Sequence, residues 1–374
     1  MDKYDIRLLL LRMALWNKTN CQLHDFIPSK VDWGKITNFF ITQTLEGMLP
    51  DAVALLPEEL GPTQDEKMEM ISLQLQVAHK NSKVNEELLS FTEELEKRDI
   101  PHVLLKGQGV AALYPHPLHR VPGDIDLYVP IAYYARINRG MLVFGGERGE
   151  ETRHHVSYVA REVMWELHHC IHYFQVERYN ARFMQMVNDA IEESVAYVNV
   201  ADGKVRVFPV MMDVLMSLAH ILDHFYCSGV GLRQLCDFAL LLDKGKSQLD
   251  RKRFLQALED LSMVRAYRIF GGICVEFLGL DETALLLPLT KSDRRLVHRV
   301  MLDCMRGGNF GRGEHRGRGT FFRWLSYYIR FVWRLIKYGA VSPSEAICWP
   351  LAKLKRFSTG TVKIKGDKSV LKKM

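Results

Sequence analysis

The sequence lacks the cysteine patterns that cross-link small proteins or hold structural zinc. Its 374 residues include seven cysteines, an odd number, scattered without a single Cys-x-x-Cys pair. This distribution argues against a disulfide framework and a zinc knuckle, and it is typical of a protein of the reducing cytoplasm. We therefore expect a cytoplasmic location.

Long apolar runs are also missing. No stretch approaches the roughly 20 apolar residues that a bilayer-spanning helix needs, and there is no internal repeat. The N-terminal segment MDKYDIRLLLLRMALW is interrupted by Arg7 and Arg12 and has no small-residue cleavage site. We expect it to form an amphipathic helix and not a signal peptide. A hydrophobic content of 48% with 25% charged residues indicates an ordinary globular protein.

Positive charge is concentrated at the C-terminal end. Residues 316–374 contain 14 Lys or Arg against two acidic residues, a balance of +12, which leaves −6 for the first 315 residues of a chain whose net charge is +6. Residues 321–338 are aromatic as well as basic. We expect residues 320–374 to contact an anionic membrane surface, with ordinary packing on the protein body as the alternative. Nucleic acid is a less favoured partner, because no base-reading module is recognisable.

The periodicity of apolar residues predicts helices, then a small sheet, then helices. A long helix is expected up to Arg98, beginning at a capping box of Thr63 and Glu66. A hairpin is expected around a tight turn at Arg161 and Glu162. Further strands are expected at 102–105, 125–129 and, at an edge, 141–144. Helical segments are expected at 108–114, 131–139 and almost everywhere after 178, most strongly in 210–243, with a Gly- and Arg-rich loop at 307–319.

The fold class is therefore α+β, with a small mixed β-sheet core between N-terminal and C-terminal helical regions. We expect four regions along the chain. They are an N-terminal helical region (1–98), an α/β core (99–177), a C-terminal helical domain (178–311), and a basic aromatic helix with its tail (312–374).

The segment Gly-Asp-Ile-Asp-Leu-Tyr-Val, residues 123–129, is the most informative one. In a strand, residues two apart share a face, so Asp124 and Asp126 point the same way. Two neighbouring carboxylates repel one another unless a cation lies between them. A divalent ion that prefers oxygen ligands, such as Mg²⁺, removes that conflict.

A glycine turn lies upstream of the acidic pair. Lys106 and Gly107 fall between a predicted strand and a predicted helix. A glycine there lets a phosphate chain approach the backbone and the unpaired N–H groups at the start of the helix. Lys106 and Arg120 offer positive charge for the same phosphates, although each is also an ordinary surface residue on the simpler interpretation.

Together these segments resemble the polymerase-β-like nucleotidyltransferase superfamily, whose core is a strand, a glycine turn, a helix and a strand bearing Asp-x-Asp. The closer resemblance, over roughly residues 85–311, is to a bacterial family labelled "uncharacterised nucleotidyltransferase". In this sequence Gln108 stands where the superfamily usually has serine, and the gap to the first aspartate is longer. The matching segments are LLKG (104–107), YP (114–115), Arg120, DIDL (124–127), ELH (166–168), His220 and His224, Arg233 and Asp237, and GNFG (308–311).

The resemblance implies transfer of a nucleoside monophosphate from an NTP to a hydroxyl acceptor. Phosphoryl chemistry with two metals normally uses a third acid on a neighbouring strand. Glu166, between Trp165 and Leu167, fits that role, with a cross-strand salt bridge as its alternative. We therefore expect Asp124, Asp126 and Glu166 to be catalytic and to bind Mg²⁺ or Mn²⁺. The nucleotide-binding residues are expected to be Lys106, Gly107, Gln108, Arg120, His168 and Arg233.

Several interpretations stay open at this stage. His220 and His224, four residues apart on a helix, could ligate zinc, but no partner at a convincing spacing supports this. His220 and His168 are better placed to line the cleft or to hydrogen-bond the catalytic acids. Arg233 and Asp237 could simply pair on a helix surface. The acceptor could be a small molecule, a glycan intermediate, a protein or an RNA end. The alternatives to an enzyme of this kind are a catalytically silent nucleotide-binding or scaffold protein docked on a membrane or partner, and an antitoxin-like nucleotidyltransferase.

Overall fold

The computed structural model describes residues 5–19, 31–193, 196–307 and 320–358. It is a mixed α/β molecule, 66% helical, with a seven-stranded mixed sheet flanked by helices, which confirms the predicted fold class. The GNFG segment at 308–311 and the end of the basic tail at 359–374 lie outside the described residues.

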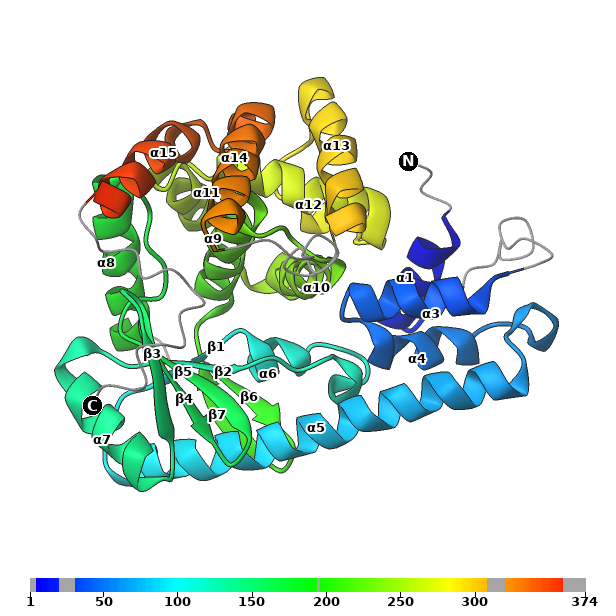
Figure 1. Ribbon diagram of the computed structural model, residues 1–374, viewed down its shortest axis with the longest axis horizontal. Coiled ribbons are helices and arrows are strands. Elements are labelled where there is room, and N and C mark those ends of the chain that lie inside the picture. The colour runs from blue at the N-terminus through cyan, green and yellow to red at the C-terminus, as the bar shows by residue number, and fades with distance from the viewer. Residues whose placement is uncertain (1–4, 20–30, 194–195, 308–319, 359–374) are drawn as a thin grey trace.

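The N-terminal region is helical as predicted, and one long helix connects it to the sheet. The capping box at the start of that helix is present, because Thr63 and Glu66 each bond the backbone of the other. Its 34 residues run along one whole side of the molecule, beneath both the N-terminal helices and the sheet (Figure 1). The elements are α1 (Ile6–Trp16), α3 (Trp33–Thr42), η1 (Glu46–Met48), α4 (Leu49–Ala54), η2 (Glu58–Leu60) and α5 (Gln64–Lys97).

The sheet has the order β3-β4-β5-β2-β1-β7-β6. At its centre β2 runs antiparallel to β1 and parallel to β5. Residue alternation divides the strands into two faces. Ile125, Leu127 and Trp165 point into an apolar core shared with α5, whereas Asp126 and Glu166 occupy the other face. The strands are β1 (Val103–Leu105), β2 (Ile125–Tyr128), β3 (Glu147–Glu151), β4 (His155–Ala160), β5 (Val163–His168), β6 (Ala196–Val200) and β7 (Gly203–Val207).

The hairpin of β4 and β5 is confirmed, with Arg161 and Glu162 in the left-handed region at its turn. The edge strand predicted at 141–144 is wrong, because these residues end α7 (Ile131–Val143). Ile137 and Met141, four residues apart, are both fully buried against the sheet core, and that helical spacing outweighs the local apolar run. The strand at this edge of the sheet is β3, which begins at residue 147.

The expectation of nearly continuous helix after residue 178 is also wrong in one place. Residues 196–207 form the β6–β7 hairpin, and β7 pairs in parallel with β1 at Leu104 and Val207. The sheet therefore continues past residue 177. Alternation of Val198, Val200, Val205 and Val207 about a turn was a usable strand signal, but pairing with β1, a hundred residues away, is not visible in a local pattern.

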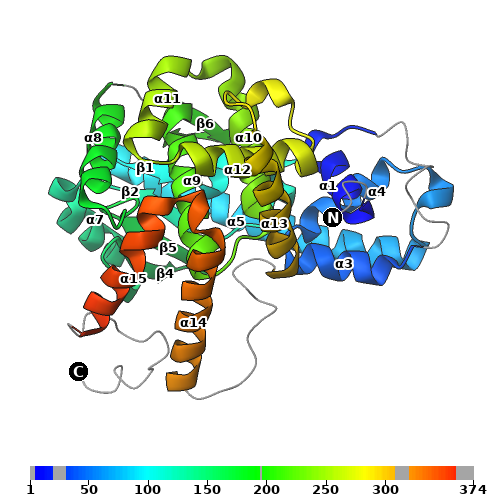
Figure 2. The same ribbon diagram turned by 90° about the horizontal axis from the view of Figure 1, so that it is seen from above.

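The remaining helices form a second lobe over the acidic face of the sheet (Figures 1 and 2). Among the described helices, α9 alone is long and apolar enough to cross a membrane, but 61% of that span is buried in the protein, so it is a core helix here. The elements are α8 (Glu177–Glu193), α9 (Val210–Cys227), α10 (Leu232–Gln248), α11 (Arg251–Asp260), α12 (Val264–Leu278), η4 (Glu282–Ala284), α13 (Lys291–Gly307), α14 (Thr320–Tyr338), η6 (Gly339–Val341) and α15 (Pro343–Ser358). The short α6 (Gly107–Ala111) and η3 (Pro117–His119) precede β2.

Candidate active site

Three carboxylates converge on the open face of the sheet. Asp126 lies in β2 directly opposite Glu166 in the parallel strand β5, and Asp124 precedes Asp126 by two residues. Carboxylate oxygens of all three lie within 4.8 Å of one another. Asp126 is only 3% exposed, whereas the Glu166 side chain is 23% exposed. The alternation of the strand and the register of β2 with β5 together produce this convergence.

The turn between β1 and α6 brings a cation to the same place. Lys106 follows β1 and caps α6 with φ +53° and ψ −146°, and its Nζ lies 3.2 Å from Oδ1 of Asp126. Gly107 follows with φ +51°, a region that favours glycine. The predicted lysine–glycine turn is therefore adjacent to the predicted acidic pair.

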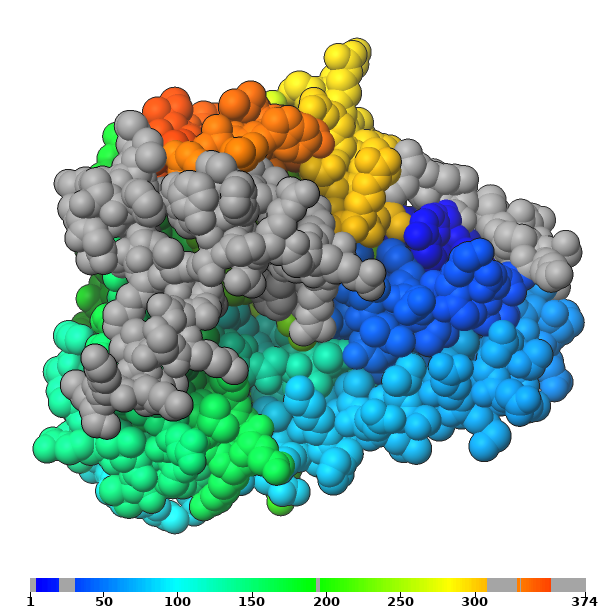
Figure 3. All heavy atoms as spheres, in the orientation of Figure 1, coloured from blue at the N-terminus to red at the C-terminus, as the bar shows by residue number. Residues whose placement is uncertain are grey.

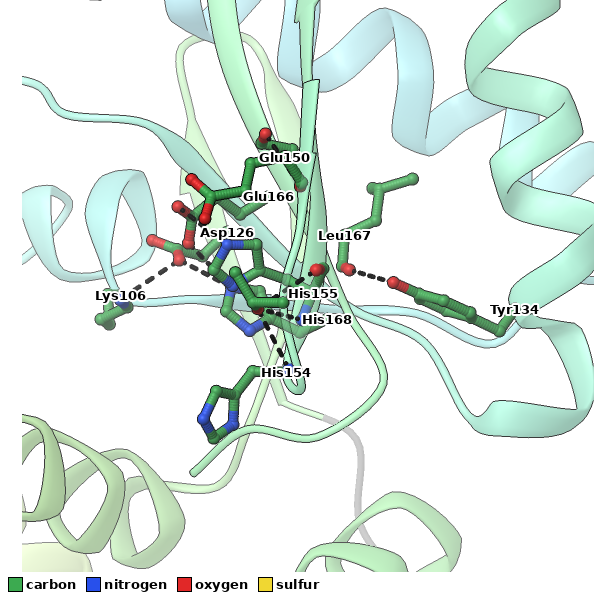
Figure 4. Close-up of polar contacts among 11 residues, drawn as sticks. Lys106, Asp126, Tyr134, Glu150, His154, His155, Glu166, Leu167 and His168 are labelled. Atoms are coloured by element: carbon green, nitrogen blue, oxygen red, sulfur yellow. Dashed lines mark hydrogen bonds and ion pairs between the residues drawn. The ribbon is translucent and has the colours of Figure 1, made fainter. Parts of the chain in front are cut away.

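Two histidines complete the cluster (Figure 4). Nε2 of His168 lies 2.9 Å from Oδ1 of Asp126 and 3.3 Å from Oε2 of Glu166. Nε2 of His155, from β4, lies 3.3 Å from the other oxygen of Glu166. The second ring nitrogen of His168, Nδ1, is buried and has no hydrogen-bond partner among the described residues. His168 thus presents its Nε2 to the acids.

Because these groups lie close together, they shift one another's pKa values. Repulsion from Asp126, together with burial, raises the pKa of Asp124 to about 6. Burial alone would raise the pKa of Asp126, but Lys106 and His168 outweigh it and hold this pKa well below its ordinary value. Burial would lower the pKa of Lys106, yet the three carboxylates outweigh it and raise that pKa. The cluster therefore stabilises positive charge, which is the condition for binding a cation.

The residues present fit a divalent metal. Three carboxylates with hard oxygen donors, close enough to share one ion, are the ligand chemistry that Mg²⁺ and Mn²⁺ use in proteins. Asp124, Asp126 and Glu166 would hold it. Lys106 already balances part of their negative charge from one side.

The cluster forms one wall of a cavity of about 830 Å³ between the sheet and the helical lobe. Every predicted site residue lines this cavity except Gln108. The opposite wall comes from α9 and α10, with polar side chains on the mostly apolar α9: Asp213, Ser217, His220, Asp223 and His224. Burial lowers the pKa of His220 well below its ordinary value, which favours the neutral imidazole at this wall.

The sequence matches a known family. A model of the family described as "Uncharacterised nucleotidyltransferase" matches residues 29–279, two thirds of the chain. The chain belongs to this nucleotidyltransferase family, and its class of activity is that of a transferase. The chain was also compared with the crystal structure of an antigenic nucleotidyltransferase-like protein from Paracoccidioides brasiliensis. The two sequences are 14% identical, the matched region covers 55% of this chain and 93% of that one, and the TM-score is 0.33. No curated protein matches the chain.

In this nucleotidyltransferase two of the predicted phosphate-binding cations are engaged with protein groups. Arg120, 4% exposed, makes a bidentate pair with Asp237 of α10, at 2.8 Å to Oδ1 and 2.7 Å to Oδ2. Tyr114 donates to the same carboxylate at 2.7 Å. Arg233 donates to the carbonyl of Val121 at 3.0 Å. The surface pairing of Arg233 with Asp237 is therefore wrong: Asp237 is the buried partner of Arg120.

Gln108 points away from the cavity. Its side-chain amide donates to Asn81 at 3.1 Å and to Asn85, both on α5. It fixes the β1–α6 turn to the long helix.

Sequence reasoning missed His155 and Asp213. The histidine stands on β4 opposite His168, so its place could have been found from the predicted hairpin, in which cross-strand partners share a face. Asp213 is one of four polar residues spaced by three and four along α9. Such a stripe in a buried apolar helix is a signal for a lined cavity.

Proposed function

We propose that this chain transfers a nucleoside monophosphate from an NTP to a hydroxyl acceptor in a reaction that depends on Mg²⁺ or Mn²⁺. The observation that carries the proposal is the convergence of Asp124, Asp126 and Glu166 within 4.8 Å of one another beside the Lys106–Gly107 turn, in a cavity of about 830 Å³. Cavities of a few hundred to a thousand cubic ångströms are typical for nucleotide-sized ligands.

The bound ion would supply positive charge that lowers the pKa of the acceptor hydroxyl and neutralises the phosphates. Asp124, Asp126 and Glu166 would hold it. Lys106, directed into the cluster, would add charge next to the phosphates, and Gly107 would let them approach the backbone. Arg120, His168 and Arg233, which line the cavity, belong to the proposed nucleotide site, and Gln108 would support it by fixing the β1–α6 turn to α5. Arg120 would act chiefly by shaping the loop before β2, because both of its outer nitrogens already face Asp237 or Val121.

The experiment uses purified protein, each α-labelled NTP, Mg²⁺ or Mn²⁺, and cell extract as the source of acceptor. Transfer of label is expected, and Asp124→Asn and Asp126→Asn should each slow it by about 10³-fold or more. Asp189→Asn, an exposed carboxylate on α8, is the matched control and should transfer at the parental rate. Tight nucleotide binding without transfer would favour the silent nucleotide-binding or scaffold role instead.

The same experiment addresses the acceptor. Label found on a small molecule, a glycan intermediate, a protein or an RNA end separates the four acceptor classes, and a labelled partner protein or tRNA would favour the antitoxin-like role.

We further propose that the C-terminal region contacts an anionic membrane surface, so that the protein is cytoplasmic and peripheral to a membrane. Support comes from three side chains of α14, Ile329, Trp333 and Ile336, which are 57%, 56% and 80% exposed. Their spacing of four and three puts them on one helix face. The +12 balance of residues 316–374 is opposite in sign to anionic lipids, which would attract it.

A further inference from the structure

One set of ligand atoms in the cluster differs in kind from the three carboxylates. His155, Glu166 and His168 offer two imidazole nitrogens and a carboxylate, and these atoms lie within 4.8 Å of one another. They come from paired strands: His155 in β4 is opposite His168 in β5, and Glu166 precedes His168 by two residues. The hairpin therefore holds all three on one face without help from a loop.

The separations within this set match the edges of a coordination sphere. Nε2 of His168 is 3.3 Å from one oxygen of Glu166, and Nε2 of His155 is 3.3 Å from the other. Oδ1 of Asp126 lies 2.9 Å from Nε2 of His168. Ligand bonds of about 2.0 to 2.2 Å leave adjacent ligand atoms about 3.0 to 3.5 Å apart. The side chains need little rearrangement to close on one ion.

We propose that His155, Glu166 and His168, with Asp126 beside them, form a second metal position that takes a first-row transition ion such as Mn²⁺, Fe²⁺ or Co²⁺. Imidazole nitrogen suits such ions, whereas Mg²⁺ prefers oxygen alone. The position adjoins the all-carboxylate set, with which it shares Glu166 and Asp126. The inference deepens the proposed function, since it concerns the ions at that same site, but binding at this position is measurable without any turnover.

The same distances would also be found if no metal bound at this position. In that arrangement the two imidazoles only donate hydrogen bonds that orient the carboxylates. The two arrangements differ in whether nitrogen enters the first shell of a bound ion, so the decisive measurement is spectroscopic.

The full-length protein is loaded with Mn²⁺ and its electron spin-echo envelope is examined for nitrogen modulation. Modulation from directly bound imidazole is expected in the parent. It should weaken in His155→Gln and in His168→Gln, and it should be unchanged in His154→Gln, whose side chain lies in the same cavity but apart from the cluster (Figure 4). Calorimetric titration with Co²⁺ should give binding weakened by about 10-fold or more in His155→Gln, with Mg²⁺ binding nearly unchanged.

Two results would overturn the inference. One is bound Mn²⁺ that shows no nitrogen modulation in the parent protein. The other is Co²⁺ affinity that does not change when His155 is replaced, in a variant whose far-ultraviolet circular dichroism matches the parent. Label transfer with Mg²⁺ in the absence of nitrogen modulation would leave the proposed function standing while this position fell. Nitrogen-bound Mn²⁺ in a protein that transfers no label would do the reverse.

Discussion

At the scale of single residues, Lys106 combines a charged side chain with a backbone conformation that residues other than glycine rarely adopt. Its φ of +53° and ψ of −146° lie near a region that only glycine populates freely, at a cost of about 1 to 3 kcal/mol for other residues. The ion pair with Asp126 at 3.2 Å helps to hold it there. Strain of this kind tends to gather at functional sites.

Replacing Lys106 separates the two effects. Lys106→Ala removes the ammonium and keeps the strain, whereas Lys106→Gly removes both. Glycine costs about 0.5 to 1 kcal/mol in backbone entropy, so we expect the glycine variant to be more stable than the alanine variant by about 1 kcal/mol. Urea denaturation of the two variants side by side measures this difference. An alanine variant as stable as the glycine variant would show that the backbone carries no strain.

Asp213 gives a pH dependence at the same scale. Burial raises the pKa of this cavity-lining carboxyl to about 8, above the 3.8 of an unperturbed Asp. Between these values the folded protein keeps a proton that the unfolded chain has released, so the free energy of unfolding falls as pH rises from about 4 to 8. Asp213→Asn removes this loss. Its stability advantage over the parent should grow by up to about 1.4 kcal/mol for each pH unit in that interval.

Thermal melts between pH 5 and pH 8 test this expectation, with Asp189→Asn on the surface of α8 as the control that should follow the parent at every pH. A constant difference between the Asp213 variant and the parent would mean that Asp213 titrates normally.

At the scale of elements, a buried ion pair ties the loop before β2 to the helical lobe. Arg120 and Asp237 are 4% and 9% exposed, and Nε and Nη2 on one edge of the guanidinium donate to the two carboxylate oxygens. Asp237→Ala leaves an unpaired buried cation, which costs about 3 to 5 kcal/mol. The pair Arg120→Met with Asp237→Leu leaves no charge and should recover part of that loss. Urea unfolding at neutral pH compares the two, and a double variant less stable than Asp237→Ala would contradict the argument.

Contacts between elements also separate what the sequence could predict from what it could not. Capping residues, the turn at Arg161 and Glu162, and the Asp-x-Asp strand are local signals, and each appears where expected. The partner of Arg120 is not a local signal, because Asp237 lies 117 residues away and its neighbour Arg233 is an equally plausible pair by helical spacing. The register of β2 with β5, which sets Glu166 opposite Asp126, is likewise fixed only by the assembled sheet.

At the scale of the whole molecule, the cavity lies where two lobes meet. The sheet side contributes Lys106 from the turn after β1 and carboxylates at β2 and β5, and the helical lobe contributes the polar stripe of α9 and residues of α10. The polar stripe of α9 and the acidic face of the sheet are each exceptions within an apolar element. Both sets of polar side chains line the same cavity, and this shared cavity accounts for polar residues in elements that are otherwise mostly apolar. A binding site built across two lobes satisfies polar groups that neither lobe could bury alone.

The far end of the helical lobe carries the surface proposed to meet a membrane. Described side chains of α14 and α15 are exposed at the side of the molecule opposite α5 (Figure 3). Deleting residues 320–374 would not test this surface cleanly, because Phe331, Leu335 and Tyr338 of α14 are buried and Tyr338 bonds Asp303 at 2.6 Å. Such a deletion would damage the fold along with the surface.

Point substitutions keep the packed face of α14 intact. Ile329→Ser, Trp333→Ser and Ile336→Ser combined should lower the fraction that floats with phosphatidylserine-containing vesicles by about 10-fold or more, since each large apolar side chain contributes about 1.5 to 3 kcal/mol when fully buried. Ile131→Ser, at a residue 69% exposed on α7, is the control and should float like the parent. Flotation of the parent should also weaken with salt, because lipid attraction to the basic tail is screened. Equal flotation on uncharged vesicles, or no loss in the triple variant, would leave α14 as an ordinary packed helix.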